Sequence, residues 1–287
     1  MYKLIKLAKS AGFCFGVERA VNLAFSNAHL KNIVTLGPII HNNAVINELQ
    51  AKGVTAVNSI NSDIENIIIR SHGVGEDIYS EAVALGINII DATCPYVKKI
   101  HKLVKENIKL GLSIIIIGDK EHPEIIGING WAKNSAIIIK DEYDYNINLL
   151  DNKISYFVVA QTTYKEEVVN KVKEILLTKQ IKFNYAHTIC SATTKRQKEA
   201  RMLAKEMQAM IVIGSKHSSN TKKLFEVCRS ECKNSFCIED ISELTTIKFN
   251  ENINIGVTAG ASTPKNIIDD VIFYLNSIIK GGNNNGI

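Results

Sequence analysis

Three of the six cysteines stand in similar surroundings, each between a short apolar run and a helical pattern. They are Cys14 in GFCFGVERA, Cys94 in DATCPYVKK and Cys190 in HTICSATTK. Three thiolates that meet at one point are suited to an iron–sulfur cluster or a zinc ion. Because three protein ligands leave a fourth position open, such a centre would be catalytic rather than structural. The alternative is three inert buried thiols, since cysteine is among the most buried residue types.

A polar turn follows each cysteine at almost the same interval, 27 or 28 residues later. The turns are GPIIH ending at His41, GDKEH ending at His122, and GSKHS ending at Ser218. A second polar strand end follows in each unit: RSHGV, AQTT and TAGAST. The matched intervals indicate an internal repeat of three units. A strand, a glycine and a polar turn before a helix also recur by chance in α/β proteins.

Hydrogen-bond donors are concentrated in these turns, directly before helical stretches. The set comprises His41, His72, His122, Ser218, Ser219, Asn220 and Ser262. With the N–H groups of the helix starts, these side chains would bind phosphate oxygens. No P-loop sequence is present, so a diphosphate would be held without a P-loop lysine and magnesium. Each serine or asparagine has an alternative role as a helix N-cap.

Glu124 follows His122 by two positions in EHPEIIG, and Pro123 fixes the turn between them. A carboxylic acid beside an open metal site is suited to protonate a leaving hydroxyl group. Thr162 of the AQTT segment could orient or relay that proton. The alternative is that Glu124 simply lies in the first turn of a helix, where acidic side chains are favoured.

The remaining cysteines form a competing group. Cys228, Cys232 and Cys237 have the spacing C-x3-C-x4-C, which matches no common zinc pair. Cys228 and Cys232 share one helical face, beside a strand expected at 235–238. We predict that all three are core or surface thiols, and a second cluster is the less favoured alternative.

The elements that must position these residues alternate between β-branched runs and amphipathic stretches. Strands are expected at 33–36, 66–70, 87–90, 113–117, 136–139, 156–160, 210–213 and 254–258, and helices at 96–110, 166–177 and 193–207. Continuous apolar strands separated by helices favour parallel sheets in an α/β fold. Each unit would present its cysteine and polar turns at the carboxyl ends of its strands, where α/β proteins bind ligands. Three such units could bring the cysteines to one pseudo-threefold axis.

Length and composition agree with a globular protein of several lobes. The 287 residues are 46% hydrophobic and 22% charged. We expect lobes at 1–94, 95–190 and 191–280, and a disordered tail at 281–287. The net charge of +5 is spread along the chain, which argues against a nucleic-acid partner. No secretory signal and no apolar run of ~18–20 residues is visible, so we expect a cytoplasmic protein without membrane contact.

Nine motifs carry a resemblance to a known family. They are AGFCFGVERAV, LGPIIHNNAVINEL, RSHGVGED, DATCPYVKKIH, GDKEHPEIIGI, AQTT, HTICSATTKRQ, GSKHSSNTKKL and TAGASTP. In this order, they resemble the 4-hydroxy-3-methylbut-2-enyl diphosphate reductase family over nearly the whole chain. The resemblance implies a trefoil of three α/β lobes around a central cavity. It also implies reduction of that allylic diphosphate, with loss of water, to isopentenyl and dimethylallyl diphosphate.

The resemblance also assigns roles to residues. It implies one oxygen-sensitive 4Fe-4S cluster per chain, with Cys14, Cys94 and Cys190 as ligands and one open iron. The diphosphate would be bound by the seven donors named above. Glu124 would deliver the proton, and Thr162 and Thr193 would lie near the hydroxymethyl end of the substrate. His217 receives no role.

The sequence contains no dinucleotide-binding or flavin motif, so the electrons must come from another protein. For this family, that partner is expected to be ferredoxin or flavodoxin. Two other functions remain open. The same cysteines could hold zinc in a hydrolase, or a cluster could serve a redox-sensing protein. The His and Ser donors together with a carboxylate favour a substrate over a sensor.

Overall fold

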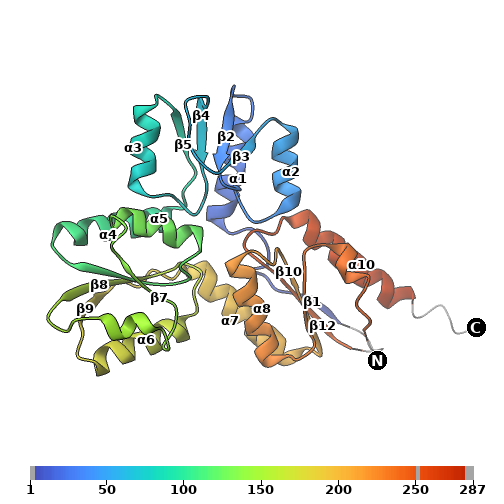
Figure 1. Ribbon diagram of the computed structural model, residues 1–287. Coiled ribbons are helices and arrows are strands. Elements are labelled where there is room, and N and C mark those ends of the chain that lie inside the picture. The colour runs from blue at the N-terminus through green and yellow to red at the C-terminus, as the bar shows by residue number, and fades with distance from the viewer. Residues whose placement is uncertain (1–3, 250–252, 282–287) are drawn as a thin grey trace, which may run out of the picture. The chain divides into compact units, whose positions relative to one another are not determined.

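The computed structural model describes residues 4–249 and 253–281 (Figure 1). The chain divides into two compact units. One consists of Gly16–Cys190, and the other combines Met1–Phe15 with Ser191–Ile287. Three four-stranded sheets are found in the described residues, and every strand pairing is parallel.

Lobe 1 is built on the first sheet of the unit Gly16–Cys190. Its strands are β2 (Ile33–Leu36), β3 (Thr55–Val57), β4 (Asn66–Ile69) and β5 (Asn88–Asp91), in the order β3-β2-β4-β5. Its helices are α1 (Phe15–Asn27), α2 (Asn43–Ala51) and α3 (Glu76–Ala84). The central strand β4 is apolar and buried from Ile67 to Ile69, as expected for a sheet covered on both faces.

Lobe 2 is built on the second sheet of the same unit. Its strands are β6 (Ser113–Ile117), β7 (Ile137–Ile139), β8 (Ser155–Ala160) and β9 (Lys182–Tyr185), in the order β7-β6-β8-β9. The helical elements are α4 (Pro95–Lys109), α5 (Pro123–Trp131), the 3-10 helix η1 (Tyr145–Leu149) and α6 (Glu166–Thr178). The isoleucines of β6 are all buried, so both faces of this sheet are core.

Lobe 3 makes up the other unit. Its strands are β1 (Ile5–Leu7), β10 (Ala209–Ile213), β11 (Ser235–Ile238) and β12 (Ile255–Ala259), in the order β1-β12-β10-β11. The helices are α7 (Ser191–Glu206), α8 (Ser219–Glu231), α9 (Ile241–Leu244) and α10 (Lys265–Gly281). No helix of the described residues is long and apolar enough to cross a membrane.

The three sheets share one topology. In each, the first strand lies between the second and the third, and the fourth strand pairs with the third. In lobe 3 the place of the fourth strand is taken by β1, which comes from the other end of the chain. The predicted α/β fold with three similar lobes is therefore confirmed. Their arrangement about a common axis stays a prediction.

Two details differ from the expected lobe boundaries. Strand β1 pairs with β12 of lobe 3, although the sequence assigned residues 1–94 to the first lobe. Gly281 ends helix α10 rather than beginning a tail, and 282–287 lie outside the described residues. The boundaries after 94 and 190 stay predictions.

Candidate functional site

The three lobes repeat the same backbone contact where the first strand ends. A glycine there donates its N–H to the end of the second strand, at 2.7–2.9 Å. The pairs are Gly37 to Val57, Gly118 to Ile139, and Gly214 to Ile238. Since parallel strands end at the same edge of a sheet, this contact sets the start of each predicted donor turn.

A second repeated contact fixes the cysteines. Each cysteine follows the fourth strand of its sheet and donates its N–H to the turn after the third strand. The pairs are Cys94 to Ser71 at 3.0 Å, Cys190 to Thr162 at 2.9 Å, and Cys14 to Ala261 at 3.3 Å. The acceptors lie in the RSHGV, AQTT and TAGAST segments. Each predicted metal ligand is therefore tied to a predicted substrate turn.

Cys94 is also held from a second side. It is the N-cap residue of α4, with a proline at the next position. A Cβ atom on Gly16 would lie 2.6 Å from the Cys94 sulfur, so only glycine fits there. Arg19 of α1 donates to the carbonyl groups of Asp91 and Thr93, which precede the cysteine. Helix α1 thus supports the loop that presents Cys94, and the helix N-terminus favours a thiolate.

Three predicted donors of lobes 1 and 2 form a histidine cluster. The ring centroids of His41 and His72 are 5.4 Å apart, and those of His72 and His122 are 5.3 Å apart. Nδ1 of His72 is buried and has no hydrogen-bond partner in the described residues. Burial lowers the pKa of His72 well below 6.5, and the nearby His122, Arg70 and His41 lower it further. His72 is therefore neutral at pH 7 and offers hydrogen bonds rather than charge.

Glu124 lies next to this cluster along the chain, in the first turn of α5. His122 caps the helix by accepting the N–H of Glu124 at 3.1 Å. The carboxylate is buried, with 2% of the residue exposed. It accepts the Thr162 N–H at 2.6 Å and the Thr162 hydroxyl at 2.7 Å. The predicted pairing of Glu124 with Thr162 is thus a direct contact.

The predicted donors of lobe 3 lie in a second cluster, within the other unit. Ser218 caps α8 by accepting the N–H of Thr221. Asn220 accepts the N–H of Ala261 at 3.0 Å, the same residue whose carbonyl group binds Cys14. The hydroxyl group of Ser262 is buried without a hydrogen-bond partner in the described residues. Ser219 and Thr193 are also buried, at the starts of α8 and α7.

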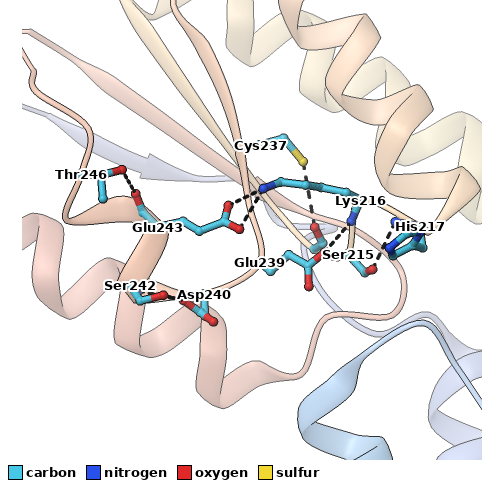
Figure 2. Close-up of polar contacts among 10 residues, drawn as sticks. Ser215, Lys216, His217, Cys237, Glu239, Asp240, Ser242, Glu243 and Thr246 are labelled. Carbon is cyan, nitrogen blue, oxygen red and sulfur yellow. Dashed lines mark hydrogen bonds and ion pairs between the residues drawn. The ribbon is translucent and has the colours of Figure 1, made fainter.

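The GSKHS turn of lobe 3 directs its lysine to an acidic partner. Figure 2 shows the Lys216 ammonium group against both oxygens of Glu243, at 2.8 and 2.9 Å. The Lys216 N–H donates to Glu239 at 2.9 Å. The charge of Lys216 is thus compensated within lobe 3, as expected for a phosphate site that uses hydroxyl and amide donors.

The competing cysteines are placed in or beside the core of lobe 3. Cys228 and Cys232 belong to a buried hydrophobic cluster, as predicted. Cys237 is partly buried on β11, with its sulfur 3.9 Å from the Gly214 carbonyl oxygen (Figure 2). Burial raises the pKa of Cys228 to about 12 and that of Cys237 to about 11. Burial thus disfavours the thiolate form of Cys228 and Cys237, which is the form that binds a metal.

Sequence reasoning missed two residues of the turns. Gln161 is fully buried, and its side-chain oxygen accepts the N–H of Asp119 at 3.1 Å, which fastens the turn before His122. Arg70 lies over Gly37 at the start of the turn that leads to His41. Both residues belong to motifs, RSHGV and AQTT, whose later residues were assigned roles, which is the signal that could have identified them.

The predicted site residues are divided between the two units. The unit Gly16–Cys190 brings together the histidine cluster, Glu124 with Thr162, and the loop of Cys94 with α1. The other unit joins Cys14 to the turn of Asn220 and Ser262. No group of three or more His, Cys, Asp or Glu side chains that could hold a metal ion is found in 4–249 and 253–281. The roles of the site residues stay predictions.

Comparisons with known proteins cover nearly the whole chain. A protein of Clostridioides difficile named 4-hydroxy-3-methylbut-2-enyl diphosphate reductase is 48% identical, over 96% of this chain and 99% of that protein. One of Alkaliphilus oremlandii with the same name is 46% identical over the same shares of the two chains.

Two solved structures are also similar. One is (E)-4-hydroxy-3-methyl-but-2-enyl diphosphate reductase, the terminal enzyme of the non-mevalonate pathway. It is 35% identical, with a TM-score of 0.68 over 96% of this chain and 100% of that one. The other, E-1-hydroxy-2-methyl-but-2-enyl-4-diphosphate reductase of Plasmodium falciparum, is 28% identical, with a TM-score of 0.85 over 96% and 88%. The sequence model of the LytB protein matches residues 5–276, and the chain therefore belongs to the LytB family.

Proposed function

We propose that this chain is a 4-hydroxy-3-methylbut-2-enyl diphosphate reductase. The reaction breaks the bond between carbon and the allylic hydroxyl oxygen. Two electrons and two protons are consumed, and the products are water and isopentenyl or dimethylallyl diphosphate. The observation that carries the proposal is the threefold contact of a cysteine with a donor turn, in a chain that matches relatives of this name from end to end.

Enzymes of the LytB family are iron–sulfur proteins. We propose one 4Fe-4S cluster, held by Cys14, Cys94 and Cys190, with one iron open. The donor set fits, because each thiol stands at the start of a helix, where a thiolate is favoured. Both boundaries between the compact units also lie beside a cysteine of this set. When bound, the cluster would supply electrons and a Lewis-acidic position.

The diphosphate would be bound by the donor turns. In lobes 1 and 2 these are His41, His72 and His122, and in lobe 3 they are Ser218, Ser219, Asn220 and Ser262. His72 Nδ1 and the Ser262 hydroxyl support this role, since each is buried with an unused hydrogen-bonding atom in the described residues. Such an atom costs free energy until a ligand satisfies it. Binding at the diphosphate also orients the distant hydroxymethyl group, which lowers the barrier to its reaction.

Glu124 and Thr162 would hold and move the proton. The Thr162 N–H fixes one carboxyl oxygen of Glu124, so the other faces the Thr162 hydroxyl group. If Glu124 carries the proton on that oxygen, it can donate to Thr162, which passes its own proton to the leaving hydroxyl. Thr193 would line the same end of the substrate. Such a relay needs hydrogen-bond distances of about 2.6–3.2 Å, which this pair has.

The electrons would come from ferredoxin or flavodoxin, and the expected location is the cytoplasm. The function is tested on protein purified without oxygen, from its absorption spectrum, iron and sulfide content, and turnover with a strong one-electron reductant. Brown protein with about four irons that yields both five-carbon diphosphates is the expected result. Brown protein without turnover would favour the redox sensor, and colourless protein holding zinc would favour the hydrolase.

A further inference from the structure

The turn after the third strand begins with a different residue in each lobe. In every lobe the carbonyl group of this residue accepts the N–H three positions later, at 3.0–3.1 Å. The pairs are Arg70 with Gly73, Gln161 with Tyr164, and Gly260 with Thr263. The next residue accepts the cysteine N–H in each case. These three positions are therefore structurally equivalent.

The two other lobes build this turn without a charge. In lobe 2, the neutral side chain of Gln161 accepts the N–H of Asp119 and so fastens the neighbouring turn. In lobe 3, the position is glycine and has no side chain at all. The turn itself therefore needs no cation, and the charge in lobe 1 calls for another explanation.

Arg70 cannot do what Gln161 does, because a guanidinium group has no hydrogen-bond acceptor. Its side chain lies instead over Gly37, where an added Cβ would meet Nη1 and lie 3.0 Å from Cζ. Nε is buried and has no hydrogen-bond partner in the described residues. No carboxylate among the described residues forms an ion pair with Arg70. A partly buried cation without a counter-charge is unfavourable unless an anion approaches it.

We propose that Arg70 supplies the fixed positive charge that holds the substrate's diphosphate at lobe 1. This deepens the proposed function and rests on it, since it takes the anion beside His41 and His72 to be a diphosphate. Arg70 is two residues from His72, and it is close enough to lower the pKa of that ring. Burial also lowers the pKa of Arg70 itself, but a guanidinium group stays charged at neutral pH. The neutral His72 thus orients the anion through hydrogen bonds, and Arg70 attracts it through its charge.

The test measures binding of inorganic diphosphate to the anaerobically purified protein by calorimetry, without magnesium. Arg70→Gln places in lobe 1 the residue that lobe 2 has at the equivalent position, so the variant is expected to fold. We expect it to bind diphosphate about 10- to 100-fold more weakly, because it loses a charge-assisted contact. Arg70→Lys keeps the charge and should lose less than about 5-fold. The KM for the allylic diphosphate should rise more in Arg70→Gln than in Arg70→Lys, and kcat should change far less than KM in both variants.

If Arg70→Gln binds diphosphate as tightly as the wild type does, the role of Arg70 is overturned and the proposed function still stands. Wild-type protein that binds neither diphosphate nor the allylic substrate would overturn the proposed function, and this inference with it.

Discussion

Among single residues, Thr162 is a direct partner of the candidate acid. It provides two hydrogen bonds to the Glu124 carboxyl group, one from its backbone and one from its side chain. The same residue accepts the N–H of Cys190 through its carbonyl group. Thr162 therefore links the proposed proton donor to a proposed cluster ligand through a single residue.

Glu124→Gln should keep the fold and the iron content but lower kcat by about 100-fold or more, since general acid catalysis contributes ~10²–10⁴-fold. The amide is nearly the same size, but it cannot donate an acidic proton. The measurement is steady-state turnover together with iron content and thermal unfolding. Glu121→Gln, which changes an exposed acid three positions earlier, should leave kcat unchanged. Normal turnover in Glu124→Gln would exclude the proton-donor role.

His101 of α4 should make stability depend on pH. Burial lowers its pKa from 6.5 to about 4, with Asp91 opposing and Lys98 reinforcing the shift. Between pH 6.5 and 4, the unfolded chain therefore binds a proton that the folded protein does not. The stability present above pH 6.5 is lost as the pH falls, by up to about 3 kcal/mol at 1.36 kcal/mol per pKa unit.

The check compares thermal unfolding of wild type and His101→Phe at pH 7.5 and pH 5. The phenyl ring keeps the stacking on Trp131, and His101 Nε2 has no hydrogen-bond partner in the described residues to lose. We expect the variant to lose less stability than wild type on acidification. An equal loss in both proteins would mean that His101 is protonated in the folded state.

At the scale of elements, helix α5 and the loop after β4 approach each other through glycines. A Cβ on Gly130 would lie 2.5 Å from the Gly75 Cα, and one on Gly127 would lie 3.3 Å from the Gly73 backbone. The Trp131 indole N–H donates to the Val74 carbonyl group at 2.9 Å and closes the contact. Because α5 carries His122 and the loop carries His72, this contact sets the spacing within the histidine cluster.

Gly130→Ala should force α5 away from the loop. Overpacking of this kind costs about 1–3 kcal/mol. We expect a lower melting temperature and weaker binding of the allylic diphosphate, seen as a higher KM. Ile126→Ala, at an exposed position of the same helix, is the control and should change neither quantity much. A Gly130→Ala protein with wild-type KM would show that the histidine spacing does not depend on this contact.

At the scale of the whole molecule, the proposed cluster needs cysteines from both compact units. Three single variants replace Cys14, Cys94 or Cys190 by serine. Each should lower the iron content well below the expected four or so per chain, because a hydroxyl group is a poor ligand for iron–sulfur clusters. Cys237→Ser should keep the wild-type content, since burial raises the pKa of that thiol to about 11 and disfavours the thiolate that would bind iron. Iron and sulfide analysis of anaerobically purified variants makes the comparison. Loss of iron in Cys237→Ser would point to a different ligand set.

Much of this molecule was predictable from sequence because its strands are buried and apolar. The predicted bounds of β2 and β6 agree with the structure, since uninterrupted β-branched runs mark strands covered on both faces. Strands β3 and β9 were missed, because they are short edge strands with exposed positions. The matched spacing located the cysteines and donor turns. The hydrogen bonds between them depend on how the third and fourth strands align, which spacing does not reveal.

Strand β1 has a consequence for how the chain becomes structured. It is synthesised before every other described strand, yet its only pairing partner, among the described residues, is β12, about 250 residues later. Lobes 1 and 2 can each close from one continuous segment as they leave the ribosome, whereas the sheet of lobe 3 must await the last strand. Such distant pairing slows folding. A gene rearranged so that β1 follows α10 would make the third sheet contiguous, and refolding of that circular permutant should be faster.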